Sequence, residues 1–164
     1  MERLLEQTQS ETVFKSSEQA WASLILALGL KKVRPFLKIW KTSNDFQKKV
    51  EDLVRIYQIR QQGSLQKKDC YQFDLDLLLQ AEQIRQEANL AVDFEGLEKT
   101  YHSLAIHDKQ EIVVNGRSLI QDLGLKPGPQ LGQLLKAVEL AIIEDRIPNE
   151  KTAIMAFIKE LKHE

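Results

Sequence analysis

A glycine- and proline-rich turn between two helical stretches constrains the fold of this 164-residue chain more than any other feature. The Asn-Gly pair at 115–116 is a turn pair, and residues 117–123 are enough for two helical turns. Gly124 follows, where a left-handed residue commonly ends a helix, and Leu125 is expected to pack back on that helix. The Pro-Gly-Pro run at 127–129 cannot continue a helix, but a proline fits the first position of a new one. The stretch therefore predicts two helices joined by a tight turn.

Apolar residues recur at helical spacing along most of the chain. Beyond the two helices around the turn, helices are expected from about residue 17 to 28, 33 to 40, 44 to 61, 70 to 90, 94 to 104 and from 149 onward, with a single turn at 108–111. The apolar run at 112–114 is too short for a strand and has no partner of its kind. The sequence predicts an all-α fold of about seven or eight helices without a sheet.

The same spacing predicts which side chains are buried. The expected buried residues are Trp21, Leu24, Ile25 and Leu28 in the first of these helices; Phe46, Val50, Leu53, Val54 and Tyr57 in the helix at 44–61; Leu77, Leu78, Ala81, Ile84 and Ala88 in the helix at 70–90; Leu131, Leu134, Leu135, Val138 and Ile142 after the turn; and Ile154, Phe157, Ile158 and Leu161 in the last helix.

Charge is distributed unevenly, although the net charge is only −1. Residues 31–68 carry eleven Lys or Arg against three Asp or Glu, so the rest of the chain is acidic. A basic segment in a nearly neutral protein indicates a surface that faces a polyanion. The alternative is a solvated helical face that neighbouring acidic helices neutralise.

One four-residue sequence occurs twice, as residues 28–31 and 123–126 (Leu-Gly-Leu-Lys). Each copy ends a predicted helix, and each places a lysine just before a proline-containing helix start. Lys126 stands next to the free N–H groups expected at the helix that begins with Pro129. These groups and the helix dipole favour an anion such as phosphate.

Several of these motifs together resemble the C-terminal part of bacterial class II CCA-adding enzymes, which are tRNA nucleotidyltransferases. The resemblance rests on the run from Val113–Gly116 through Leu123-Gly124, the 127–129 turn and Leu131-Gly132 to Pro148–Lys151, and on Lys32–Leu37 with Trp40-Lys41. It covers nearly the whole chain in the order of the family. With the break near residues 105–109, it predicts a helical body at 1–106 and a helical tail at 107–164. The single cysteine fits a reducing compartment, and the expected location is the cytoplasm.

The resemblance also implies what the chain lacks and what it binds. The catalytic head and the nucleotide-selecting neck of the family, which use Mg²⁺ with CTP and ATP, would lie elsewhere in a longer polypeptide, and no cofactor is expected for this chain. The body and tail would hold the backbone of the acceptor and T-arm of tRNA. The residues expected to contact RNA are Lys31, Lys32, Arg34, Lys38, Lys41, Arg117, Lys126 and Gly128.

A second motif suggests a different function, a small metal-dependent nucleotidyltransferase. Gly63-Ser64 followed by Asp74 and Asp76 matches the superfamily pattern in which two carboxylates hold metal ions. That chemistry needs the two carboxylates on one face of a strand, whereas on a helix they point about 200° apart. The surrounding pattern is helical, so this alternative is not favoured.

Glu51-Asp52 with Arg55 matches the pattern by which the neck of the family selects CTP and ATP. Here it follows the body segment at 32–41, whereas in the family the neck precedes that segment. Asp52 and Arg55 are more simply a pair three residues apart on one helix.

Other chemistry is sparse. Cys70 is the single cysteine and has no ligand spacing with the three histidines, so neither a disulfide nor a zinc site is expected. No apolar run is long enough for a membrane span. Trp21 and Trp40 are expected to pack rather than to stack on bases. A helical protein-interaction module without an RNA role is the remaining alternative.

Overall fold

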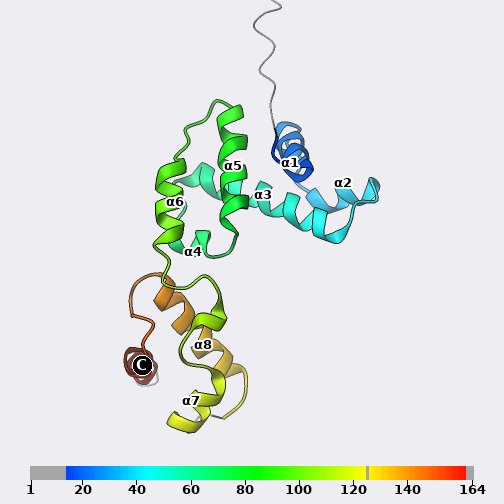
Figure 1. Cartoon of the computed structure of the whole chain (residues 1–164). Helices are drawn as coiled ribbons and strands as arrows, with labels where there is room; N and C mark the ends of the chain where they lie inside the picture. Colours follow the sequence, from blue (N-terminus) through cyan, green and yellow to red (C-terminus); the bar gives the residue numbers. More distant parts are fainter. Residues whose placement is uncertain (1–13, 125, 162–164) are drawn as a thin grey trace, which may run out of the picture. The chain divides into compact units, whose positions relative to one another are not determined.

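Every regular element in the described part of the protein is helical. The computed structural model describes residues 14–124 and 126–161, and within these ranges it contains nine α-helices, one 3₁₀ helix and no strand (Figure 1). The prediction of an all-α fold is thus confirmed. None of the helices in these ranges has the length and apolar content needed to cross a membrane.

The chain forms two compact units. The first comprises the described residues up to Ser64 together with Leu75–Leu97, and the second comprises Leu65–Asp74 and the described residues from Glu98 onward. The division into a body at 1–106 and a tail at 107–164, named after the parts of CCA-adding enzymes, stays a prediction.

The first unit is built around α3 (Asn44–Gln62), which contacts α1 (Ser17–Ala27), α2 (Val33–Ile39) and α5 (Leu75–Glu87). The Ser43 side chain caps α3 by accepting a hydrogen bond from the Phe46 amide at 3.2 Å. The predicted apolar face of α3 is confirmed, because Val50, Leu53, Val54 and Tyr57 are buried; Phe46 is half-buried.

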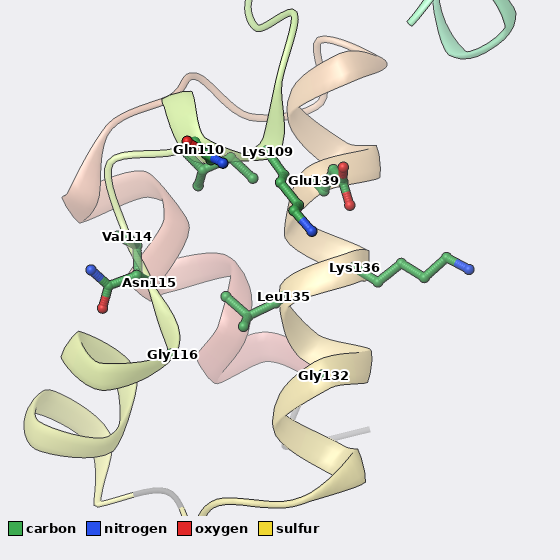
Figure 2. Close-up of a pocket in the computed structure, with 10 residues that line it drawn as sticks. Lys109, Gln110, Val114, Asn115, Gly116, Gly132, Leu135, Lys136 and Glu139 are labelled. Carbon is green, nitrogen blue, oxygen red and sulfur yellow. The ribbon is translucent and has the colours of Figure 1, made fainter. Parts of the chain in front are cut away.

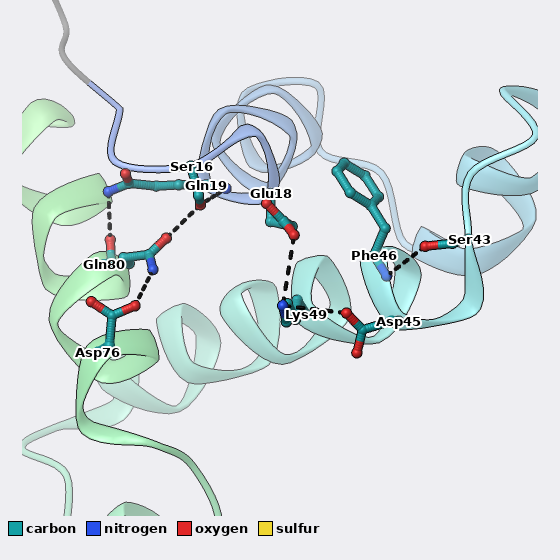
Figure 3. Close-up of polar contacts among 9 residues, drawn as sticks. All are labelled: Ser16, Glu18, Gln19, Ser43, Asp45, Phe46, Lys49, Asp76 and Gln80. Atoms are coloured by element: carbon teal, nitrogen blue, oxygen red, sulfur yellow. Dashed lines mark hydrogen bonds and ion pairs between the residues drawn. The ribbon is translucent and has the colours of Figure 1, made fainter.

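The face that α1 buries differs from the prediction. Ile25 is buried, but Leu24 and Leu28 are 46% and 57% exposed, and the unit instead encloses Gln19 and Ala22. Figure 3 shows why a glutamine is accommodated there: Gln19 Nε2 donates to the Gln80 carbonyl at 3.1 Å. Ser16 donates to Gln80 Oε1, and Gln80 Nε2 donates to Asp76, both at 2.6 Å. This network joins α1 to α5 and determines which side of α1 faces inward.

The predicted helix at 70–90 is two helices, a short α4 (Lys67–Cys70) and α5. After Cys70 the chain continues in tight turns, with the amide of Phe73 donating to the carbonyl of Cys70 at 3.2 Å. Phe73 is buried, so its side chain anchors the break. At the other end, α5 ends at Glu87, and Ala88 is exposed rather than buried. The remaining expected positions of α5 are buried or half-buried.

A buried ion pair fastens α5 to α3. Arg60 Nε lies 2.6 Å from Glu82 Oε1, and the Glu82 side chain is only 1% exposed. The other carboxylate oxygen of Glu82 accepts a hydrogen bond from the Asp93 amide at 3.2 Å. Both oxygens therefore have partners, as a buried carboxylate requires.

In the second unit, α8 (Pro129–Ile143) contacts α4, α7 (Gly116–Leu123) and α9 (Lys151–Leu161). The 3₁₀ helix η2 (Lys109–Glu111) also belongs to this unit, and α6 (Phe94–His102) begins in the first unit and ends in the second. Several expected core positions are fully buried, namely Val138, Ile142, Ile154 and Ile158. Leu131, Leu134, Leu135, Phe157 and Leu161 are half-buried.

The turn between α7 and α8 has the predicted local structure. Gly124 ends α7 in the left-handed conformation, with φ of 62° and ψ of 26°. Pro129 is the first residue of α8, and Gly128 is its N-cap. The first copy of the repeated sequence behaves alike, because Gly29 has φ of 64° and the Leu30 amide donates to the Ile25 carbonyl. Leu125 lies outside the described residues.

Candidate nucleic-acid interface

Five of the residues expected to contact RNA surround α2 in the first unit. Lys31 and Lys32 precede the helix, Arg34 and Lys38 belong to it, and Lys41 follows it. All five are exposed. We call them the α2 patch.

Ion pairs neutralise only part of the basic segment. Arg34 Nε lies 2.7 Å from Glu51 Oε2, but both side chains are about half exposed, so the pair contributes little to stability. Lys49, Arg60 and Lys67 also pair with acidic residues. In contrast, Lys31, Lys32, Lys38 and Lys41 have no ion-pair partner among the residues that the structure describes.

The end of α2 exposes a tryptophan between two of these lysines. Lys41 adopts φ of 54°, a left-handed conformation that costs about 1 kcal/mol or more for a residue with a Cβ. Trp40 is 59% exposed, and its ring meets Trp21 edge-on at 5.5 Å. The sequence predicts that both tryptophans pack against other side chains. Trp21 is half-buried, but most of Trp40 faces solvent. An exposed indole among lysines suits stacking on an unpaired base.

The other three predicted residues lie in the second unit, and we call them the α8 site. Arg117 is in the first turn of α7, Lys126 is in the connection, and Gly128 starts α8. All are exposed, and no side chain caps the N-terminus of α8. Neither Arg117 nor Lys126 has an ion-pair partner within the described ranges. A 15-residue helix whose N-terminus is open to solvent favours an anion there.

A cavity of about 420 Å³ lies in the same unit, between η2, the residues that follow it and α8 (Figure 2). Ile112, Val114 and Leu135 contribute apolar surface, while Lys109, Lys136 and Glu139 contribute charge. The sequence did not predict this cavity, because η2 and α8 supply its lining from positions more than 20 residues apart. The one available signal was Gly132, a glycine inside a helix.

The two aspartates of the alternative nucleotidyltransferase do not form a strand motif. Asp74 precedes α5 and Asp76 lies in its first turn, where its carboxylate accepts the hydrogen bond from Gln80. No group of three His, Cys, Asp or Glu residues among the described positions is arranged to hold a metal ion.

The Glu51-Asp52 motif lies within α3, and its side chains interact with other residues of the first unit. Glu51 accepts the hydrogen bond from Arg34. Burial raises the pKa of Asp52, although Lys48, Arg55 and Arg34 act in the opposite direction. The structure thus places this motif on a helix of the first unit, as the sequence predicted.

Comparison with known proteins identifies the family. A family model described as tRNA nucleotidyltransferase domain 2 matches residues 12–158. The CCA-adding enzyme of Streptococcus gordonii is 52% identical over 162 residues, which are 99% of this chain and 40% of that protein. The CCA-adding enzyme of Streptococcus pneumoniae serotype 19F is 47% identical over 154 residues, 94% of this chain and 39% of its own length.

A solved structure agrees with these relatives. The crystal structure of the Bacillus stearothermophilus CCA-adding enzyme in complex with CTP superposes with a TM-score of 0.83 at 28% identity, over 92% of this chain and 39% of that one. The chain thus spans about two fifths of the length of the proteins that it matches. The predicted resemblance to the C-terminal part of CCA-adding enzymes is confirmed, and the chain belongs to the tRNA nucleotidyltransferase domain 2 family.

Proposed function

We propose that this chain is the tRNA-binding portion of an enzyme that adds CCA to the 3′ end of tRNA, and that it holds the RNA while other parts of the polypeptide catalyse the addition. The α2 patch carries the proposal: four exposed lysines without ion-pair partners among the described residues lie within eleven positions of the chain. The relatives that the chain matches are named CCA-adding enzymes.

The α2 patch suits the sugar–phosphate backbone better than base edges. Lysine ammonium groups bind phosphates as point charges, and A-form RNA hides its base edges in a deep, narrow major groove. The acceptor stem and T-arm of tRNA are such helices. Trp40 would add one contact with an unstacked base or a ribose.

The α8 site would hold a second phosphate. In the first turn of α8, Pro129 has no N–H, and the N–H of Leu131 donates to the Gly128 carbonyl at 3.1 Å. The N–H of Gln130 would therefore donate to a phosphate oxygen, and Lys126 would supply a full positive charge next to it. Arg117, at the start of α7, would widen the same basic surface.

The catalytic requirements would be met outside this chain. Mg²⁺ with CTP and ATP would bind in the head and neck of the complete enzyme, which would act on tRNA in the cytoplasm. Leu24, Leu28 and Ile39 are exposed apolar residues, and Ile39 is 76% exposed. Such side chains favour a contact with the remaining domains of the same polypeptide.

Fluorescence anisotropy with labelled tRNA tests the proposal. The parent chain should bind tRNA, and the triple variant Lys31→Glu, Lys32→Glu, Lys38→Glu should bind at least about tenfold more weakly at low salt, because three phosphate contacts become repulsive. A control variant, Lys15→Glu, Lys99→Glu, Lys159→Glu, changes the net charge equally through three exposed lysines outside both sites. Equal loss of affinity in both variants would reduce the binding to a net-charge effect and refute the patch.

A further inference from the structure

The cavity between η2 and α8 has the size and the chemical surface of a ligand site. Its volume of about 420 Å³ lies in the range of small-molecule pockets, roughly 300–1,000 Å³. All of its lining residues belong to the second unit, and they come from η2, the segment that joins η2 to α7, the start of α7, and α8.

Gly132 in this lining has no explanation in the packing of the chain itself. It lies within α8, where a glycine costs about 1 kcal/mol relative to alanine. A Cβ atom added at Gly132 would meet nothing within 4 Å, so no neighbouring side chain excludes a larger residue. A glycine that borders a pocket allows another molecule to approach the helix backbone closely.

The charged residues of the cavity are available to a ligand. Figure 2 shows Lys109 extending from η2 towards α8, and Lys136 extending from α8. Neither lysine has an ion-pair partner within the described residues. Glu139 is fixed by the Tyr71 hydroxyl, which donates to its Oε1 at 2.7 Å. Its other oxygen has no partner in the described part of the chain and remains an acceptor.

These features together suit a nucleotide as the ligand of the cavity. The apolar wall of Ile112, Val114 and Leu135 suits the face of a base, and the lysines suit its phosphate. A carboxylate oxygen accepts a hydrogen bond from an exocyclic amino group, which cytosine, adenine and guanine carry and uracil lacks. Gly132 would admit the ribose or base next to the helix backbone.

We propose that the cavity binds one unstacked, amino-bearing nucleotide of the tRNA that the chain holds. The inference rests on the proposed function, because tRNA would supply the nucleotide. The pocket itself is formed by residues of the second unit alone. Specific recognition of RNA commonly uses bases that are turned out of a helix or loop, and a pocket of this kind would add sequence preference to a grip that is otherwise electrostatic.

Titration of the folded chain with mononucleotides tests the pocket without tRNA. In two-dimensional ¹H–¹⁵N NMR spectra, 5′-CMP and 5′-AMP should shift the backbone amides of Gly116 and Gly132, whereas 5′-UMP should shift them less at equal concentration. Glu139→Gln should remove most of the difference between CMP and UMP, because an amide both donates and accepts. Shifts from CMP that spread over the α2 patch but spare the pocket would overturn the proposal.

Filling the pocket tests its role in tRNA binding. Gly132→Leu should abolish the shifts caused by CMP and weaken tRNA binding about fivefold, the lower end of the effect of losing one base contact. Gly132→Ala, which adds a single methyl group at the same point of the wall, should reduce both effects less than Gly132→Leu does. Gly132→Leu should lower the salt slope by at most about one, because the pocket holds a single phosphate and the α2 patch is intact. Suppose that the parent binds tRNA, that Gly132→Leu binds it with the same affinity, and that no mononucleotide shifts the amides of the parent. That result would refute the pocket and leave the proposed function standing. Failure of the parent to bind tRNA, with CMP shifts intact, would refute the proposed function instead.

Discussion

The side-chain oxygen of Asn149 accepts a hydrogen bond from the backbone amide of Val113 at 3.1 Å. The amide nitrogen of the same side chain donates to the carbonyl of Glu111 at 2.9 Å. Asn149 thus clamps the segment between η2 and α7, which forms one wall of the cavity. Lys151, two residues later, pairs with Asp122 of α7 at 2.7 Å. The Pro148–Lys151 motif therefore orders the second unit internally.

Asn149→Asp should destabilise the second unit by about 0.5–1.5 kcal/mol, the contribution of a typical hydrogen bond, because both bonds of Asn149 lie at the surface. The substitution keeps an acceptor for Val113 but replaces the donor to Glu111 with a carboxylate oxygen that faces a carbonyl. Urea denaturation followed by circular dichroism measures the loss. Asn44→Asp is the matched control, because Asn44 is exposed in the first turn of α3, where a negative charge is tolerated. Equal stability of the Asn149→Asp variant and the parent would show that the clamp is dispensable.

Gly124→Val should lower stability by about 1 kcal/mol or more, since φ of 62° is strained for any residue with a Cβ. A Cβ at this position would meet nothing within 4 Å, so the loss would come from the backbone alone. Gly132→Ala, in the interior of α8, should be neutral or stabilising in the same thermal melts. A Gly124→Val variant with an unchanged melting temperature would contradict the left-handed end of α7.

Stability should fall as the pH rises from about 9 to about 11. Burial raises the pKa of the Cys70 thiol from 9.0 to about 11, so in this window the unfolded chain loses a proton that the folded chain retains. Burial also raises the pKa of Tyr71, and the hydrogen bond to Glu139 raises it further. The Tyr71 shift therefore also lowers stability as the pH rises. The free energy of unfolding in urea should therefore be lower at pH 10.5 than at pH 8. Cys70→Ala should reduce this difference, and an identical difference in variant and parent would exclude Cys70 as its source.

The isolated chain should incorporate no CMP or AMP into tRNA that lacks its 3′ end. It spans about two fifths of its relatives, and Asp76 is bound to Gln80 on a helix rather than placed on a strand. Incubation with labelled CTP or ATP and Mg²⁺ provides the measurement. Incorporation that disappears in Asp74→Ala would favour the small nucleotidyltransferase.

Local signals account for the parts of the fold that the sequence predicted. The end of α7 at Gly124 and the start of α8 at Pro129 depend on backbone preferences that each residue carries with it. Hydrophobic spacing does not reveal the break between α4 and α5, because the break depends on the burial of Phe73 in the folded unit. Hydrophobic spacing predicts Leu24 and Leu28 on the buried face of α1, which is wrong, because this spacing does not reveal the polar contacts of Gln19 with α5.

The role of the candidate residues in RNA binding stays a prediction. Charge density in the sequence located the α2 patch, whose residues lie close together along the chain. It did not reveal that Arg34 is paired with Glu51 or that Trp40 is exposed. The cavity depends on the fold of the second unit, so the sequence contains no direct sign that Lys109 and Glu139 line the same cavity.

The salt dependence of tRNA binding tests the central claim most directly. Each phosphate contact releases condensed counterions, so log Kd should rise steeply with log salt concentration for the parent. In the Lys31→Glu, Lys32→Glu, Lys38→Glu variant the slope should fall by about one for each lost contact, up to about three in total. The Lys15→Glu, Lys99→Glu, Lys159→Glu control should keep the parent slope. A parent whose affinity does not depend on salt, or equal slopes in all three proteins, would contradict a phosphate grip by the α2 patch.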